Sequence, residues 1–374
     1  MKHTRAPHPT DTLVHCSAPA KLILSGEHAV LYGSPALSLA IDLKSHCTVA
    51  YQAADWVNAN NTHRQQTHNL PHFTLQLTDL KLEQSVTASD WQTRAQAINQ
   101  RFLDFKNNLL TINVVLKSPF DLVLMCLWAF NQVHEIKTGH WRVCIHSEVP
   151  IGRGLGSSAG VIVSLLASLF KAHHTSVSKH ELLALAKQVE SYQHGSSSGL
   201  DPATLIYAGL LKYQMGHPIQ TLPNQKHAAW LIDTGTPQSN TGACVQKVKT
   251  HHQHNVTLWQ DFAHTCSKIE QAWLNNCDLN HNAQTASLKK AIHQNHLLLC
   301  KIGVVPDKVQ QVITQLNTEL NAACKICGAG SILGDQAGMV LCMSDQSPAE
   351  LCQQYGYSVW PLIPQNQGVH CELD

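Results

Sequence analysis

The spacing of apolar residues along the chain predicts a mixture of strands and helices. Apolar side chains at every second position predict strands over 14–24, 35–51, 73–77 and 141–145, because successive side chains of a strand point to opposite faces. Residues 52–72 are polar and predict a loop. The other predicted elements are helices near 91–108, 119–134, 157–171, 178–190, 239–250, 256–276, 283–301 and 306–321, and strands over 203–213, 228–233, 322–327 and 338–343.

The order of these elements predicts the fold class. Strands and helices alternate without a regular strand–helix–strand rhythm, which favours an α+β protein in two layers. The segment 216–225 holds two prolines and few apolar residues, so it is the candidate junction between domains over 1–221 and 222–374. A length of 374 residues also suits two domains.

Composition and charge narrow the classes of partner. Lys and Arg number 26 and Asp and Glu 25, which leaves a net charge of +1. A nucleic-acid-binding protein needs a basic face, and an anionic membrane needs a basic cluster, so neither partner is expected. The longest apolar run, 122–130, is about half of the ~20 residues that a membrane span needs. We therefore expect a soluble cytoplasmic protein.

Histidine and cysteine are abundant but are not arranged like metal ligands. The densest histidine group is His251, His252 and His254, in a polar stretch without a nearby cysteine pair, which favours a solvated loop over a metal site. Most of the 13 cysteines stand in apolar segments, as reduced thiols of a cytosolic protein do. Cys324 and Cys327 form one CxxC, but the pattern predicts a strand running into a glycine turn rather than a zinc or redox site.

The strongest chemical signal is a glycine-rich segment over residues 150–160. It stands between a predicted strand and a predicted buried helix, where bent backbone and unpaired amides form an anion site sized for phosphates. The segment matches neither a Walker A loop nor G-x-G-x-x-G, and a helix that merely begins after a glycine turn is the alternative. The candidate ATP-binding residues are Pro150, Gly152, Gly154, Leu155, Gly156, Ser157, Ser158 and Ala159.

Three segments together resemble the GHMP kinases. Residues 147–159 resemble the nucleotide-binding motif of that superfamily. Residues 18–33, which contain Gly-Glu-His-Ala-Val-Leu-Tyr-Gly, resemble the mevalonate kinases among them. Residues 190–201 have the family's spacing from a helix-borne acid to a loop aspartate. The resemblance implies a domain like the second domain of ribosomal protein S5, followed by a ferredoxin-like domain, with the site in the cleft between them.

The resemblance also implies a reaction and its residues. It predicts transfer of a phosphoryl group from ATP, with Mg²⁺, to the primary hydroxyl of mevalonate. Asp201 would accept the proton of that hydroxyl or orient it, and Lys21 would keep Asp201 ionised. Ser158 and Glu190 would hold Mg²⁺. The implied substrate-binding residues are Glu27, His28, Ser198 and Thr241.

Some positions depart from the family pattern and keep alternatives open. The third glycine motif of the family is broken here by residues 331–333, Ser197 replaces a proline, and Pro202 follows Asp201. The alternatives are another kinase of the superfamily, acting on phosphomevalonate or a sugar, and a regulatory binder without catalysis. A homodimer is common in the family and is a further expectation.

Overall fold

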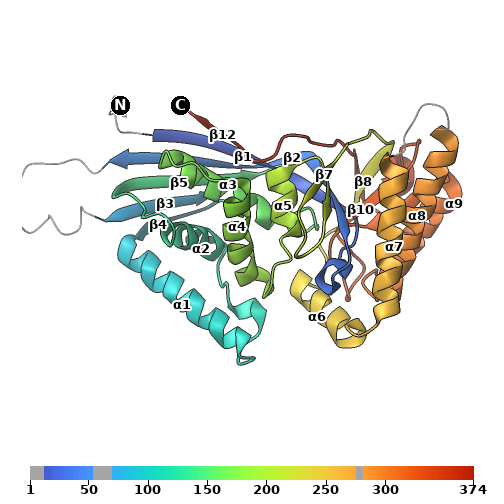
Figure 1. The fold of residues 1–374 in the computed structure, drawn as a ribbon, viewed down its shortest axis with the longest axis horizontal. Coiled ribbons are helices and arrows are strands. Elements are labelled where there is room, and N and C mark those ends of the chain that lie inside the picture. The colour runs from blue at the N-terminus through green and yellow to red at the C-terminus, as the bar shows by residue number, and fades with distance from the viewer. Residues whose placement is uncertain (1–11, 54–69, 275–280) are drawn as a thin grey trace, which may run out of the picture.

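The computed structural model describes residues 12–53, 70–274 and 281–374. Two sheets follow one another along the longest axis of the molecule, and helices cover each of them (Figure 1). This arrangement confirms the α+β class. The predicted loop over 52–72 lies mostly outside the described residues, whose nearest strands end at Ala53 and begin at Pro71.

The larger sheet is built around two long strands, β1 and β2. Its order is β12-β1-β2-β5-β3-β4, and β6 and β7 extend it beside β2. Only β3 and β5 run parallel; the other neighbours are antiparallel. The strands are β1 (Thr12–Ser25), β2 (Ala36–Ala53), β3 (Pro71–Leu77), β4 (Leu82–Thr87), β5 (Gly139–Ser147), β6 (Leu210–Tyr213), β7 (Gln220–Leu222) and β12 (His370–Leu373).

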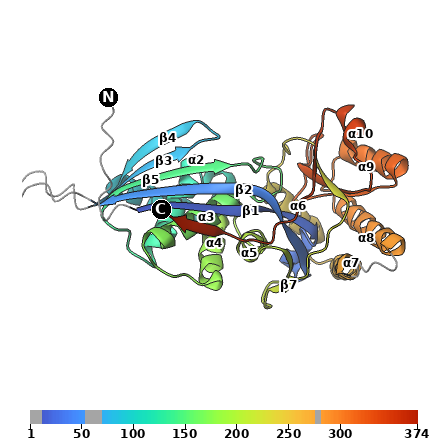
Figure 2. The same cartoon turned by 90° about the horizontal axis from the view of Figure 1, so that it is seen from above.

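Helices cover one face of this sheet (Figures 1 and 2). The innermost helix, α3, buries nearly its whole circumference, as its apolar sequence predicts. Ser178 and Glu181 form a capping box at the start of α4. The helices are α1 (Ala88–Lys106), α2 (Pro119–Asn131), α3 (Ser157–Ala172), α4 (Lys179–His194) and α5 (Leu200–Tyr207), with short 3-10 helices η1 (Ala29–Tyr32) and η2 (Ile112–Val114).

The second sheet is smaller and entirely antiparallel, with the order β11-β8-β10-β9. Its strands are β8 (Ala229–Asp233), β9 (Ala323–Ile326), β10 (Met339–Met343) and β11 (Ser358–Pro361). The helices of this half are α6 (Thr241–His252), α7 (Val256–Leu274), α8 (His281–Lys301), α9 (Asp307–Leu320) and α10 (Ala349–Gln353). Pro306 precedes α9, and Val309, Val312, Ile313 and Leu316 form the buried face of that helix.

The two halves share an apolar core. The second halves of β1 and β2 contribute Leu22 and Leu39, which belong to one buried cluster with Trp273 of α7 and Leu341 of β10. Burying such side chains stabilises by roughly 2 kcal/mol each. The two halves are therefore joined by a continuous apolar cluster.

The strand predicted over 203–213 is wrong in its first half. Residues 203–207 belong to α5, and only β6 is a strand. Pro202 suits the first turn of a helix, where its missing N–H removes no hydrogen bond. The helix ends at Ala208 and Gly209, both with positive φ, before the chain extends into β6. An apolar run of this length fits a buried helix as well as a buried strand, so the pattern alone misled.

The prediction that the cysteines are reduced thiols is wrong for two of them. Cys16 on β1 and Cys371 on β12 form a disulfide. The C-terminal strand β12 returns to the first sheet and pairs with β1, which brings together cysteines 355 residues apart (Figure 2). Ten cysteines of the described residues are free thiols, and Cys277 lies outside the described part.

The structure also places the histidine group and the CxxC pair that the sequence analysis considered. His251 and His252 end α6 rather than lying in a loop. Cys324 lies on β9 and Cys327 just beyond it, at a turn through Gly328, as predicted. Within the described ranges, no group of three or more His, Cys, Asp or Glu side chains is placed to hold a metal ion. None of the helices found in the same ranges is long and apolar enough to cross a membrane.

Candidate active site

The glycine-rich segment forms a loop between β5 and α3. Gly156 is the residue before α3 and has a left-handed backbone, so it turns the chain into the helix. No side chain caps this helix end, which leaves its first amides free for an anion. The amide of Lys21 donates to the Leu155 carbonyl at 3.0 Å, which ties the loop to β1.

The loop is packed against the broken third glycine motif. A Cβ on Gly154 would overlap the carbonyl of Cys327, and a Cβ on Gly338 would lie 2.8 Å from the Arg153 carbonyl. The amide of Met339 donates to that same carbonyl at 3.0 Å. Two segments that are 173 or more residues apart in the chain therefore pack their backbones together, and the second segment supports the first.

This packing predicts a strong effect of Gly154→Ala. The new methyl group would meet the Cys327 carbonyl, and φ is +81° at this position, so the loop must move. We expect the KM for ATP to rise about tenfold or more, since a displacement of about 1 Å can cost that much. Gly216→Ala is the matched control because φ is +78° there and no atom lies within 4 Å of the added group. A KM for ATP within twofold of wild type in Gly154→Ala would contradict the prediction.

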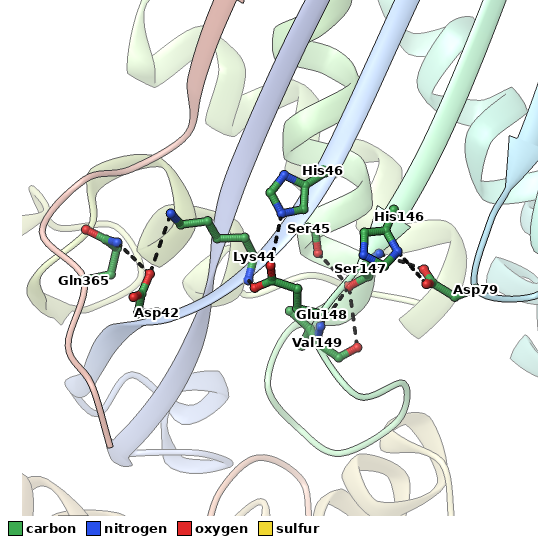
Figure 3. A network of polar contacts seen from close by, with 10 residues as sticks. All are labelled: Asp42, Lys44, Ser45, His46, Asp79, His146, Ser147, Glu148, Val149 and Gln365. Carbon is green, nitrogen blue, oxygen red and sulfur yellow. Dashed lines mark hydrogen bonds and ion pairs between the residues drawn. The ribbon is translucent and has the colours of Figure 1, made fainter. Parts of the chain in front are cut away.

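Polar contacts brace the base of the loop (Figure 3). The amide of Val149 donates to the Ser147 hydroxyl at 3.2 Å, and that hydroxyl lies 3.0 Å from the hydroxyl of Ser45 on β2. Glu148 accepts the Lys44 amide at 3.0 Å and pairs with His46 at 3.5 Å. These contacts hold the loop against β2 before it reaches the glycines.

Lys21 and Asp201 form an ion pair beside the loop. The Lys21 ammonium lies 3.0 Å from Asp201 Oδ1, and the lysine side chain is buried while that of Asp201 is 30% exposed. A register shift in the pairing of β1 with β2 lies just before Lys21, between Pro19 and Ala20, and such irregularities re-aim side chains. Asp201 stands in the first turn of α5, after Gly199. The exposed acid and the buried base thus come from different elements and meet as the resemblance implies.

Glu190 lies near the end of α4 and is almost completely buried. It accepts a hydrogen bond from the Ser197 hydroxyl. The pKa of Glu190 is raised to about 8, mainly by burial and next by the charge of Asp201, whereas Ser197, Lys21 and Lys187 oppose the shift. Two neighbouring carboxylates of this kind favour a cation between or beside them.

Glu27 and His28 lie in the turn between β1 and η1, and both contact the C-terminal half. Glu27 forms a buried ion pair with Lys325 of β9. His28 Nε2 lies 3.0 Å from the carbonyl of Ala329, in the third glycine motif. Burial lowers the pKa of His28, against smaller opposing effects of Ala329 and Glu27, so the ring is neutral near pH 7.

The remaining predicted substrate residues have different surroundings. The Ser198 hydroxyl accepts the Leu200 amide at 3.2 Å and so helps to start α5 beside Asp201. Thr241 is exposed at the first residue of α6, after Asn240, which caps that helix. The structure thus gathers Lys21, Glu190 and Asp201 into one cluster, whereas Thr241 lies at the start of α6 in the second half of the molecule.

The residues that break the third glycine motif have defined places. Ser331 turns inward, is buried, accepts the Ser239 amide at 3.3 Å and donates to the Leu333 carbonyl at 2.6 Å. The Ser239 hydroxyl in turn accepts the Ile332 amide at 3.2 Å. These bonds fasten the motif to the loop that carries Thr241, so the departure replaces open glycine backbone by a closed, hydrogen-bonded turn.

Two ion pairs of the site were not predicted. Arg153 of the phosphate loop pairs with Asp233 at the end of β8 at 2.7 Å. Lys325 pairs with Glu27 inside the protein. The sequence holds one signal for the second pair, because a lysine within the apolar stretch Ala323–Ile326 is rarely buried without a partner.

Two cavities differ in their relation to this cluster. A polar cavity of about 430 Å³ borders the phosphate loop, lined by Arg153, Asp233 and Gln336 among others. A larger hollow of about 620 Å³ follows the exposed face of α9 between Asp307 and Glu319. Neither lining includes Lys21, Glu190 or Asp201, so we assign the chemistry to that cluster on the geometry of its ion pair.

Known proteins resemble the chain in sequence and in fold. Residues 121–209 match the family model of the GHMP kinases N terminal domain. A mevalonate kinase of Pyrococcus abyssi is 27% identical over 322 residues, which cover 85% of this chain and 86% of that protein. A mevalonate kinase of Arabidopsis thaliana is 28% identical over 354 residues, covering 85% and 88%. The crystal structure of the Methanococcus jannaschii mevalonate kinase, at 20% identity, covers 96% of this chain and 100% of its own with a TM-score of 0.69.

Fold, loop and relatives together define the class: the chain has the two-domain α+β fold of the GHMP kinases and is a small-molecule kinase. Among these kinases it is similar to the mevalonate kinases along most of its length.

Proposed function

We propose that this kinase phosphorylates the primary hydroxyl of mevalonate with ATP. The observation that carries the proposal is the Lys21–Asp201 ion pair, which lies beside the phosphate loop and leaves Asp201 partly exposed. Several relatives that align with most of the chain are mevalonate kinases, which supports this acceptor.

The residues of the site divide the work of phosphoryl transfer. The free amides at the start of α3 and the loop backbone bind the phosphates of ATP. Asp201 orients the acceptor hydroxyl and accepts its proton, while the ammonium of Lys21 pairs with Asp201 and stabilises the developing alkoxide. Positioning and charge neutralisation supply most of the catalysis of such a reaction, so this short set of residues suffices.

Glu190 and Ser158 fit a Mg²⁺ site. Glu190 and Asp201 are a pair of neighbouring acids whose negative charges a divalent cation would neutralise. The raised pKa of Glu190 shows that its charge is unfavourable without such a cation. Ser158, in the first turn of α3, would add its hydroxyl. When bound, the cation neutralises charge on the phosphates of ATP.

The closed third motif favours a second acceptor class. Ser331 and Ser239 join two loops of the C-terminal half at the rim, and this closure is a departure from the open glycine motif that the family usually has. A shifted acceptor, such as phosphomevalonate or a sugar, remains the alternative for this reason. The homodimer and the domain boundary near 221 also stay predictions.

Formation of ADP by the purified protein with ATP and Mg²⁺ tests the proposal. Mevalonate, phosphomevalonate and galactose are compared at equal concentrations. We expect turnover with mevalonate and a kcat/KM at least 100-fold lower with the other two. Turnover restricted to another acceptor would replace mevalonate, and the absence of turnover with all three would favour a non-catalytic binder.

A further inference from the structure

We propose that Lys325 is a positioning residue for the acceptor: through Glu27 and Ala329, the third glycine segment fixes the turn that presents Glu27 and His28 to the substrate. The inference rests on the proposed function and deepens it. It gives the broken motif a role on the acceptor side, in addition to its support of the phosphate loop.

Lys325 has no access to solvent and stands on β9, a strand whose four residues are all buried. Its ammonium pairs with Glu27 and donates to the Ile23 carbonyl at 2.9 Å. A buried charge is tolerated only when paired and hydrogen-bonded. Lys325 therefore joins the end of β1 and the following turn to the second sheet at two points.

A third contact comes from Ala329, four residues after Lys325 in the chain. His28 Nε2 lies 3.0 Å from the Ala329 carbonyl. Because a carbonyl oxygen only accepts hydrogen bonds, Nε2 carries the proton and Nδ1 of the neutral ring is an acceptor. The segment 325–329 thus fixes both the position of the turn and the tautomer of His28.

The turn is confined on its other side as well. Gly26 has φ of +94°, and a Cβ there would lie 2.6 Å from the Cα of Ala36 on β2. The turn is therefore held between β2 and the segment 325–329, and its orientation depends on Lys325 rather than on local flexibility.

Two acceptor atoms of this turn remain without a partner among the described residues. They are Glu27 Oε2 and His28 Nδ1, and both are buried. Native proteins rarely leave such atoms unpaired unless a ligand or water completes them. Acceptors held in this way suit the hydroxyl groups of an alcohol substrate, and they stand a few residues after Lys21 on the same strand and turn.

A purely structural ion pair is the competing explanation, and kinetics separates the two. We expect Lys325→Met to raise the KM for mevalonate tenfold or more while the KM for ATP stays within threefold. Lys325→Arg keeps the charge, so it should fold and show a smaller rise of about threefold. Arg94→Met is the matched control, because Arg94 of α1 pairs with the buried Asp121 of α2 at 3.0 Å on the helices that cover the first sheet, and its two KM values should not change.

Hydrogen–deuterium exchange tests the role of Lys325 independently of which acceptor the enzyme uses. In Lys325→Met, or in Lys325→Arg if the first variant does not fold, amides of residues 26–32 should exchange at least fivefold faster than in wild type. Those of 157–170 should exchange at the wild-type rate. If wild type does not turn over mevalonate, the proposed acceptor fails, and this exchange result alone decides the role of Lys325. Unchanged exchange in the turn, or equal rises of both KM values, would overturn the proposal.

Discussion

Asp201→Asn is expected to lower kcat by about 10³-fold or more while the affinity for ATP stays within a few-fold. The substitution keeps the size of the side chain but removes the group that takes the proton and the negative charge that pairs with Lys21 at 3.0 Å. The phosphate loop and the start of α3 contain neither residue, so ATP binding should persist. Single-turnover kinetics with mevalonate, together with an ATP binding isotherm, measures both quantities.

A second aspartate provides the control for this change. Asp42 pairs with Lys44 at 3.7 Å on the surface, and both side chains are about 40% exposed, so Asp42→Asn should leave kcat unchanged. If Asp201→Asn retained more than a tenth of the wild-type kcat, Asp201 could not be the group that accepts the proton. An equal loss of ATP affinity would instead indicate that the variant disturbs the whole cleft.

Local motifs were predictable because each carries its own physical cause. The buried helix α3 follows from an apolar sequence on all sides, and the capping box of α4 from Ser178 and Glu181. The phosphate loop follows from glycines placed between a strand and a helix. The pairing of Lys21 with Asp201 required the family resemblance as well, since 180 residues separate them in the chain.

Long-range pairings could not be predicted from local pattern. The strand β12 has four residues, and its partner β1 is chosen by the fold as a whole. The disulfide between Cys16 and Cys371 depends on that pairing, and connectivity cannot be deduced from cysteine positions. The ion pair of Lys325 could not be predicted for the same reason, because its buried partner, Glu27, lies in the other half of the molecule.

Both halves of the molecule therefore contribute to the ATP side and to the acceptor side of the site. On the ATP side, the loop before α3 rests on the backbone of Cys327 and Gly328. On the acceptor side, the Gly26–His28 turn is held by Lys325 and Ala329. One segment of the second half, 325–330, thus contacts both substrate sides: Cys327 and Gly328 on the ATP side, and Lys325 and Ala329 on the acceptor side.

Glu190→Gln is expected to abolish Mg²⁺-dependent turnover and yet to stabilise the free protein at alkaline pH. The pKa of Glu190 is raised from about 4.5 to about 8, so between these values the folded state binds a proton that the unfolded state releases. The stability of wild type therefore falls as the pH rises through this window and reaches its low plateau above pH 8. Glutamine carries no charge to bury, so the variant should be more stable by roughly 2–4 kcal/mol at pH 8.5 and gain little at pH 5.

The raised pKa of Glu190 also sets the pH dependence of Mg²⁺ binding. Mg²⁺ requires the ionised carboxylate, so its apparent affinity in wild type should rise up to tenfold per pH unit until about pH 8 and then level off. Thermal unfolding with ATP, with and without Mg²⁺, should show stabilisation by the cation in wild type only.

Glu181→Gln is the control on the same helix: it weakens the capping box, so it should lower stability slightly and keep both turnover and the Mg²⁺ response. A Glu190→Gln variant that still responds to Mg²⁺, or that is less stable than wild type at pH 8.5, would show that Glu190 serves the fold rather than the cation.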